Sequence, residues 1–347
     1  MRHLRTLSAA SLAAAALAVA PAAPVDAALL NTFVTSADIS AAMGTSATIG
    51  FAYAGDKFIG SVQRDGTNVL FQTNLSGGSV TPFAPSVSLA ATSASEHFVT
   101  SSLGLGGFPS RDIYVASGNG VMHITHDGTS SNLFVSGLAG GVRGILFDAV
   151  GTFGNDMLIT TITGDVYRVN SAGTVTHIAS TGEDTEGLDI AVAGPFTGDL
   201  IVASEGSGNI RAINPVTGLI ATPIANVPSA EELTFVPLNL NTGDPVEGFY
   251  GANYAVDIQK GDASNFTSLL GDIIVTGETT HLVTDLHFNG TSYVGTTLGT
   301  FPNQPEDGIF VTAAIVNPTV PEPSALALLG SALAGLAFAR RPRRRNA

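Results

Sequence analysis

The body of the chain repeats a pattern of short apolar runs and glycine turns with a period of about 44 residues. One copy consists of Gly144–Phe147, Phe153–Ile159 and Gly164–Asn170. The next copy consists of Gly187–Ile190, Phe196–Val202 and Gly208–Asn214. Each copy holds several short strands, because Gly and Asn accept the positive φ of tight hairpin turns. A period of this length with strands of this size is typical of β-propeller blades.

Weaker copies of the pattern extend the repeat in both directions. They occupy Asp56–Phe71, Phe108–Ile124 and Gly248–Asp257. The inner strands, which line the channel of a propeller, are predicted to begin near residues 48, 97, 144, 187, 232 and 285. The sequence therefore predicts an all-β, six-bladed β-propeller. A seven-bladed ring that uses residues 237–283 differently is one alternative, and a β-sandwich, which would leave the repeat unexplained, is another.

A ring of blades has to close, and the last copy lacks an obvious fourth strand. That copy consists of Asp285–Phe288, Ser292–Thr296 and Gly308–Val311. Residues 29–34 form a short, mostly apolar run of the length of a strand. We predict that residues 29–34 supply the missing strand, beside residues 308–312.

Aspartates recur at one position of the repeat. Asp56, Asp112, Asp156 and Asp199 each stand shortly before the predicted second strand of a copy. A residue that recurs in every blade is seldom a catalytic site, so we interpret these aspartates as turn residues.

Both ends of the chain carry features of delivery signals. Residues 1–27 begin with a basic stretch, continue with an apolar run and end in small residues, as in a secretory signal peptide cut after Ala27. Residues 318–347 form a separate tail that starts with a proline-rich linker. The propeller domain is therefore predicted to span residues 28–317.

The tail has three parts. Its first part is a motif that the two prolines hold extended, and it consists of Val320, Pro321, Glu322 and Pro323. Residues 324–339 carry no charge and suit a short membrane helix. The last part is a cluster of stop-transfer arginines that favours the cytoplasmic side, and it consists of Arg340, Arg341, Arg343, Arg344 and Arg345. An ordinary C-terminal membrane anchor is the alternative interpretation.

This order of motif, apolar helix and arginines resembles the PEP-CTERM sorting signal. The resemblance implies a Gram-negative bacterium that makes exopolysaccharide, and an exosortase-type enzyme that cuts near residues 321–323. It also implies an inner-membrane intermediate held by residues 324–339, followed by release to the cell surface or the extracellular matrix. It says nothing about the activity of the body, whose partner we expect to be a polysaccharide or a matrix protein.

Composition excludes several classes of function. The chain has no cysteine, which rules out disulfides, thiol nucleophiles and thiolate metal sites. Its 14 Lys+Arg stand against 28 Asp+Glu, and half of the basic residues lie in the two end segments. The body is therefore strongly acidic, which excludes binding of nucleic acid through its phosphates. An acidic exported protein attracts divalent cations instead.

Acidic residues stand at or near the predicted starts of several inner strands. They are Glu96, Glu186, Glu231, Glu232 and Asp285. Because inner-strand starts meet at one mouth of a propeller channel, these carboxylates are candidate ligands for Ca²⁺, which prefers several hard oxygen ligands. The alternative is a set of solvated charges on the rim. No catalytic residue is predicted.

These observations favour an exported β-propeller that binds a partner of unknown identity. A Ca²⁺-dependent hydrolase is the alternative, because Glu186–Leu188 and Glu231–Phe235 resemble strand starts of six-bladed lactonases, which need a metal. A purely structural matrix protein without a saturable ligand is the third possibility.

Overall fold

The computed structural model describes residues 29–219 and 222–312, and their strands form six antiparallel sheets. Blade 1 contains β2 (Thr48–Tyr53), β3 (Phe58–Val62), β4 (Leu70–Thr73) and β5 (Thr81–Phe83). Blade 2 contains β6 (Val99–Ser101), β7 (Ile113–Ser117), β8 (Gly120–Ile124) and β9 (Ser131–Val135). Blade 3 contains β10 (Val142–Phe147), β11 (Met157–Thr161), β12 (Asp165–Val169) and β13 (Val175–Ser180).

The other three blades are less regular. Blade 4 contains β14 (Leu188–Ile190), β15 (Leu200–Ser204), β16 (Asn209–Asn214), β17 (Gly218–Leu219) and β18 (Ala225–Asn226). Blade 5 contains β19 (Ala230–Phe235), β22 (Ile273–Gly277), β23 (Leu282–Phe288) and β24 (Tyr293–Thr300). Blade 6 contains, from the inside outward, β25 (Pro305–Val311), β20 (Gly248–Asn253), β21 (Asp257–Asp262) and β1 (Asn31–Val34). The one α-helix of the described residues is α1 (Ser36–Met43), and 3₁₀ turns occupy Ser93–Ser95 and Ala263–Phe266.

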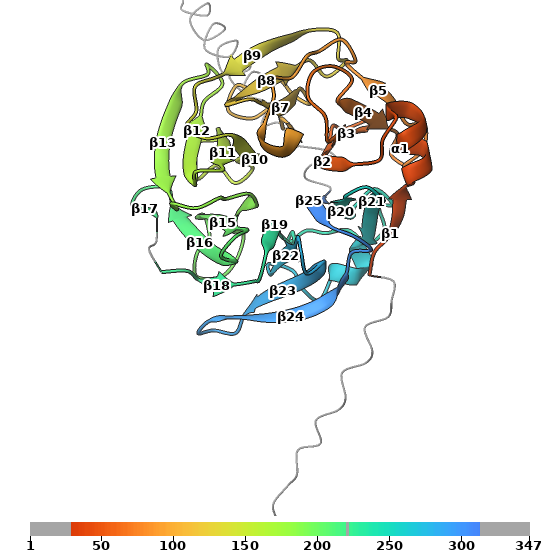
Figure 1. Ribbon diagram of the computed structural model, residues 1–347. Coiled ribbons are helices and arrows are strands. Elements are labelled where there is room, and N and C mark those ends of the chain that lie inside the picture. The colour runs from red at the N-terminus through yellow and green to blue at the C-terminus, as the bar shows by residue number, and fades with distance from the viewer. Residues whose placement is uncertain (1–28, 220–221, 313–347) are drawn as a thin grey trace, which may run out of the picture.

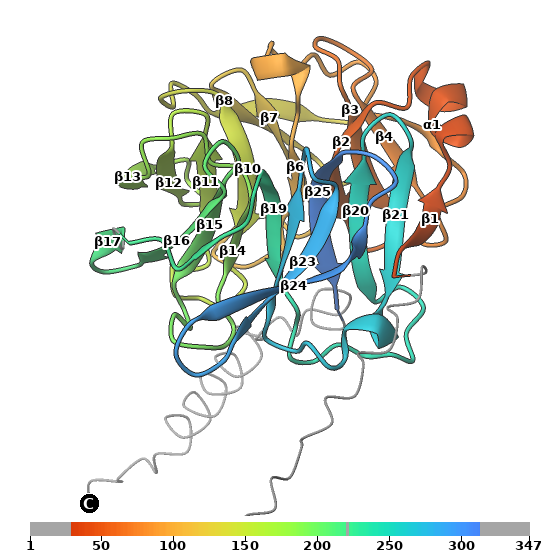
Figure 2. The same cartoon turned by 60° about the horizontal axis from the view of Figure 1, so that its bottom comes forward.

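The six blades stand around a central axis (Figure 1), and their inner strands β2, β6, β10, β14, β19 and β25 contact one another in a closed ring. A side view shows these strands running along the axis (Figure 2). The structure thus confirms the predicted all-β, six-bladed propeller and excludes the seven-bladed ring and the sandwich. None of the helices in residues 29–219 and 222–312 is long and apolar enough to cross a membrane. The predicted signal peptide (1–27) and sorting tail (318–347) lie outside the described residues.

The hydrophobic core is divided among the interfaces between blades. The buried apolar side chains form six clusters, and each cluster lies mainly between two neighbouring blades. A sheet presents its alternate side chains to opposite faces, so each blade can bury one face against the blade before it and the other against the blade after it. The ring must therefore close for the first and last blades to bury both faces.

The N-terminal strand takes part in that closure. β1 pairs with β21, with Asn31 opposite Lys260 and Val34 opposite Ile258. The prediction that residues 29–34 complete the last blade is confirmed, but the predicted neighbour is wrong. β25, which contains residues 308–311, lies at the opposite, inner edge of the same sheet.

Blades 5 and 6 are interleaved in sequence. After β19 of blade 5 the chain forms β20 and β21 of blade 6, and only then returns to β22, β23 and β24 of blade 5. Five predicted inner-strand starts lie within two residues of the observed ones, but the start near residue 285 is wrong because Asp285 lies in β23. The sixth inner strand is β25. The repeat alone could not reveal this exchange, because β23 has the same residue pattern as an inner strand.

The recurring aspartates stand before second strands, and Asp112, Asp156 and Asp199 bind the third strand of their own blade, whereas Asp56 pairs with His126 of blade 2. Side chains of the third strand donate to them in the pairs His123–Asp112, Arg168–Asp156 and Asn214–Asp199. Each of these three carboxylates thereby links two strands of one blade.

Glycines let neighbouring inner strands approach backbone to backbone. A Cβ atom on Gly187 would lie 2.5 Å from the backbone nitrogen of Leu233 in the next blade. Gly187 also donates its N–H to the carbonyl of Glu231 at 2.9 Å. This close contact brings the acidic residues of blades 4 and 5 together in the channel.

Candidate functional site

Acidic side chains gather at the end of the channel where the inner strands begin. Some precede or begin inner strands and others lie in turns between second and third strands: Glu96, Asp184, Glu186, Glu205, Glu231, Glu278 and Glu306. We call these seven residues, together with Arg143 of β10, the carboxylate mouth.

Arg143 neutralises one side of the carboxylate mouth. Its guanidinium lies 2.9 Å from Asp184 (Nη2 to Oδ2) and 2.7 Å from Glu186 (Nε to Oε1). It also forms an ion pair with Glu96. Three carboxylates of neighbouring blades therefore converge on one cation, which holds their backbones in place.

The other side of the mouth is dominated by carboxylates. Oxygen atoms of Glu205, Glu231 and Glu278 lie within 4.8 Å of one another, and Asp184, Glu186 and Glu205 form a second such group. Glu231 is 3% exposed, and its Oε2 atom has no hydrogen-bond partner. These two groups, which share Glu205, are the places in the described residues where a metal ion could be held by three carboxylates.

A glutamine crosses from this group to the last inner strand. Nε2 of Gln304 donates to Oε1 of Glu278 at 2.6 Å and to Oε1 of Glu306 at 2.7 Å. The amide thereby satisfies two carboxylates without supplying a charge.

Crowding raises the pKa values in the mouth. Burial raises the pKa of Glu186 to about 7 and that of Glu306 to about 9. The pKa of Glu205 is raised to about 7, mainly by a hydrogen bond with Glu278 and secondly by burial. Burial and the neighbouring Glu186 raise the pKa of Glu231 well above its usual range. Without a bound metal ion, the mouth therefore retains protons near neutral pH.

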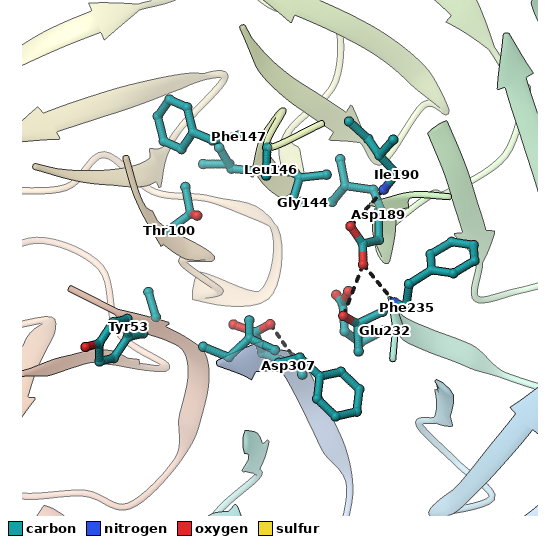
Figure 3. A pocket seen from close by; sticks show the side chains of 18 of the residues that line it. Tyr53, Thr100, Gly144, Leu146, Phe147, Asp189, Ile190, Glu232, Phe235 and Asp307 are labelled. Atoms are coloured by element: carbon teal, nitrogen blue, oxygen red, sulfur yellow. Dashed lines mark hydrogen bonds between the residues drawn. The ribbon is translucent and has the colours of Figure 1, made fainter. Parts of the chain in front are cut away.

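Farther along the inner strands the channel widens into a cavity of about 350 Å³, which we call the chamber. Residues of all six inner strands line it, among them Tyr53, Thr100, Phe147, Ile190 and Phe235 (Figure 3). The lining continues past the strand ends to Val150, which is 47% exposed, so the chamber reaches the surface on that face.

The chamber has one acidic wall. Asp189 of β14, Glu232 of β19 and Asp307 of β25 lie on one side of the pocket, and Tyr53 and Thr100 lie on the other (Figure 3). The lining contributed by β2, β6 and β10 carries no charged side chain. Three consecutive inner strands thus supply carboxyl groups, and the three opposite strands supply apolar and neutral surface.

Backbone hydrogen bonds fix two of these acids. Asp307 accepts from the N–H of Phe51 at 2.6 Å, and Asp189 accepts from the N–H of Phe235 at 2.7 Å. Both bonds connect neighbouring blades. Burial raises the pKa of Asp189 to about 6 and that of Asp307 to about 7. Burial and the nearby Asp307 raise the pKa of Glu232 well above its usual range.

The structure brings some of the predicted site residues together and separates others. Glu96, Glu186 and Glu231 all belong to the carboxylate mouth. Glu232 instead lines the chamber, and the pairing of β19 is irregular between Ala230 and Leu233. The predicted position of Asp285 is wrong. Asp285 lies in β23, the third strand of blade 5, between Ile274 of β22 and Thr296 of β24, and it lines neither part of the channel.

Sequence reasoning missed most of the remaining residues. Glu205 and Glu278 lie in turns between second and third strands, and the repeat does not show that these turns reach the channel. Glu306 and Asp307 stand on the inner strand that the interleaved topology hides. Arg143 could have been found, because it directly precedes the predicted inner-strand start at residue 144 in a body with few basic residues.

Comparison with solved structures shows the same propeller architecture. A chain of a nidogen–laminin complex is 13% identical with a TM-score of 0.53, and the match covers 76% of this chain and 84% of that chain. An aldose sugar dehydrogenase from Streptomyces coelicolor, solved with bound PQQ, is 12% identical with a TM-score of 0.52, covering 80% and 87%. An auxiliary nutrient binding protein from Bacteroides thetaiotaomicron is 10% identical with a TM-score of 0.51, covering 80% and 70%. At these identities the likeness shows the fold alone.

The sequence itself matches one family model, and no curated protein matches it. The matching model describes the PEP-CTERM protein-sorting motif and covers residues 319–345. That motif implies export through a membrane-anchored intermediate and processing by an exosortase-type enzyme. The chain is therefore a six-bladed β-propeller that carries a PEP-CTERM sorting motif at its C-terminal end.

Proposed function

We propose that this chain is an exported binding protein of the cell surface or the exopolysaccharide matrix, and that its chamber takes up a small ligand. The sorting motif at residues 319–345 supports export. The observation that carries the proposal is the chamber, a cavity of about 350 Å³ on the axis of the ring. Cavities of this size and mostly apolar lining, with a few convergent polar groups, are typical of small-molecule sites.

The walls of the chamber define the chemistry of the ligand. The apolar side offers surface to a hydrocarbon or ring portion, whose burial is favourable by about 25 cal/mol per Å². The acidic side offers carboxylate oxygens to a cationic or hydrogen-bond-donating group. At pH 7.5 an anionic ligand would be repelled by Asp189 and Asp307, because this pH lies above their pKa values of about 6 and about 7. The ligand is therefore a small molecule with an apolar body and a cationic or hydroxyl-bearing end.

Three compounds of equal length test this assignment. Hexylamine, hexanol and hexanoate share one apolar body and differ only in the end group. We expect saturation-transfer NMR at pH 7.5 to show the strongest binding for the amine, weaker binding for the alcohol and none for the acid. Leu146, which lines the chamber, provides a blocking variant: Leu146→Trp should abolish binding, whereas Leu133→Trp on the exposed edge strand β9 should leave it unchanged. Equal binding of all three compounds, or binding that survives Leu146→Trp, would refute the proposal.

A Ca²⁺-dependent hydrolase is a second candidate, favoured by the two carboxylate groups of the mouth. A metal held there would lower the pKa of a bound water and produce a nucleophile. A panel of lactones and phosphoesters, assayed with and without Ca²⁺, separates the two candidates. Turnover that requires Ca²⁺ and disappears in Glu186→Gln would support the hydrolase over the binding protein.

A further inference from the structure

One buried carboxylate oxygen in the mouth has nothing to bind. Oε2 of Glu231 is enclosed, has no hydrogen-bond partner, and belongs to a side chain that is 3% exposed. Removing a carboxylate oxygen from water without a partner is unfavourable, so such atoms are rare in folded proteins. Glu231 belongs to the group in which Glu205, Glu231 and Glu278 each bring one carboxylate oxygen within 4.8 Å of the others.

The neighbouring donors already serve other carboxylates. The ion pairs of Arg143 are with Glu96, Asp184 and Glu186, all on the other side of the mouth. The side-chain amide of Gln304 donates its hydrogen bonds to Glu278 and Glu306. A cation that binds several oxygen atoms at once would give this oxygen a partner and would neutralise the group.

We propose that Glu205, Glu231 and Glu278 bind a hard divalent cation, with Ca²⁺ preferred over Mg²⁺. Ca²⁺ accepts six to eight oxygen ligands in flexible geometry, whereas Mg²⁺ requires a nearly ideal octahedron and retains its water more strongly. The mouth offers carboxylates that can each bind through one or both oxygens, and it offers them from three separate segments of the chain. Zn²⁺, which is usually bound by nitrogen and sulfur, fits this all-oxygen group less well.

The three ligands come from different parts of two neighbouring blades. Glu231 lies on the inner strand β19, Glu205 lies in the turn after β15 of blade 4, and Glu278 lies in the turn after β22 of blade 5. A cation shared among them ties both turns to the inner strand. It also relieves the repulsion that otherwise keeps protons on these carboxyls. This site lies at the strand starts, so it does not depend on what the chamber binds.

Calorimetric titration of the full chain, after dialysis against EDTA, tests the inference with CaCl₂, MgCl₂ and MnCl₂ as the probes. We expect one Ca²⁺ to bind per chain at pH 7.5, more tightly than Mg²⁺, and to raise Tm. Glu231→Gln should weaken the Ca²⁺ affinity by about tenfold or more. It should not lower the Tm measured in EDTA, because it removes a charge from a repulsive group, and this distinguishes loss of a ligand from loss of the fold.

Glu247 provides the matched control. It is 1% exposed and also has an unpaired oxygen, but it lies outside both carboxylate groups. Glu247→Gln should therefore bind Ca²⁺ with the affinity of the wild type. The inference is overturned if none of the three ions binds, if Glu231→Gln binds Ca²⁺ like the wild type, or if Glu247→Gln loses affinity to the same extent.

Discussion

Nε of Arg143 lies 2.7 Å from Oε1 of Glu186, and this ion pair marks the boundary between two halves of the channel mouth. On one side of it Arg143 also contacts Asp184 and Glu96. On the other side, Glu205, Glu231 and Glu278 approach one another without a cation from the described residues. The protein thus supplies one positive charge to the mouth, and in our proposal a bound divalent cation supplies the rest.

Replacing Arg143 should lower the free energy of unfolding. Arg143→Met removes the partner of three carboxylates, and Glu186 among them is 2% exposed. Leaving buried charges unpaired typically costs about 3–5 kcal/mol. We expect a loss of this size in urea unfolding at pH 8 and a smaller loss at pH 5, where the carboxyls bind protons. Arg168→Met is the control, because its side chain is 41% exposed and such pairs contribute about 0–1 kcal/mol. Equal losses in the two variants would contradict this account of the mouth.

The acids of the chamber should make stability depend on pH. The pKa values of Asp189 and Asp307 are raised by burial to about 6 and about 7, above the usual value of 3.8. The folded chain therefore holds more protons than the unfolded chain between about pH 4 and pH 7, and its stability falls as the pH rises through this window. A pKa shift of one unit between the folded and unfolded chain corresponds to about 1.4 kcal/mol of unfolding free energy.

Asp307→Asn isolates one of these acids. The amide can still accept one of the two backbone N–H bonds but does not titrate. We expect the free energy of unfolding, measured in urea between pH 4.5 and pH 8, to fall less steeply in this variant than in the wild type. A slope unchanged by the substitution would mean that Asp307 keeps an ordinary pKa.

A single methyl group should disturb the contact between blades 4 and 5. The Cβ of Gly187→Ala would lie 2.5 Å from a backbone nitrogen, which cannot move aside as a side-chain end could. Overpacking of this kind typically costs about 1–3 kcal/mol. Gly141→Ala serves as the control, because a Cβ there meets nothing within 4 Å. Thermal unfolding should show a clear drop in Tm for Gly187→Ala only, and a similar drop in both would point to a general intolerance of alanine.

The sorting motif predicts a change of location. Combined Pro321→Ala, Glu322→Ala and Pro323→Ala substitutions remove the motif and leave the apolar and arginine-rich segments intact. We expect the variant to accumulate uncut in the inner membrane, where an immunoblot of cell fractions would detect the longer form. A variant that is shortened and released like the wild type would show that processing does not read these residues.

Sequence patterns predicted the fold well where the repeat is complete. Glycine turns at regular spacing located five inner strands, because a propeller needs the same turn chemistry in each blade. The sixth was missed, since pairing between β20 and β25 is a contact over a long sequence separation that leaves no local signal. The misplacement of Asp285 follows from the same exchange.

The candidate site was predicted less completely than the fold. Glu96, Glu186 and Glu231 were found because they stand at strand starts, which meet by symmetry. Glu205 and Glu278 reach the channel from turns, and the length and direction of a turn are not encoded in the repeat. Glu231 lies in the mouth and Glu232 lines the chamber, where the pairing of β19 is irregular. The sequence does not reveal this irregular pairing.

The most direct test of a cation in the mouth is an anomalous difference map from a crystal grown with Ca²⁺ and measured at long wavelength. The account predicts a peak about 2.3–2.6 Å from carboxylate oxygens of Glu205, Glu231 and Glu278. A map without a peak at the mouth, or with Ca²⁺ bound only elsewhere on the acidic surface, would contradict it.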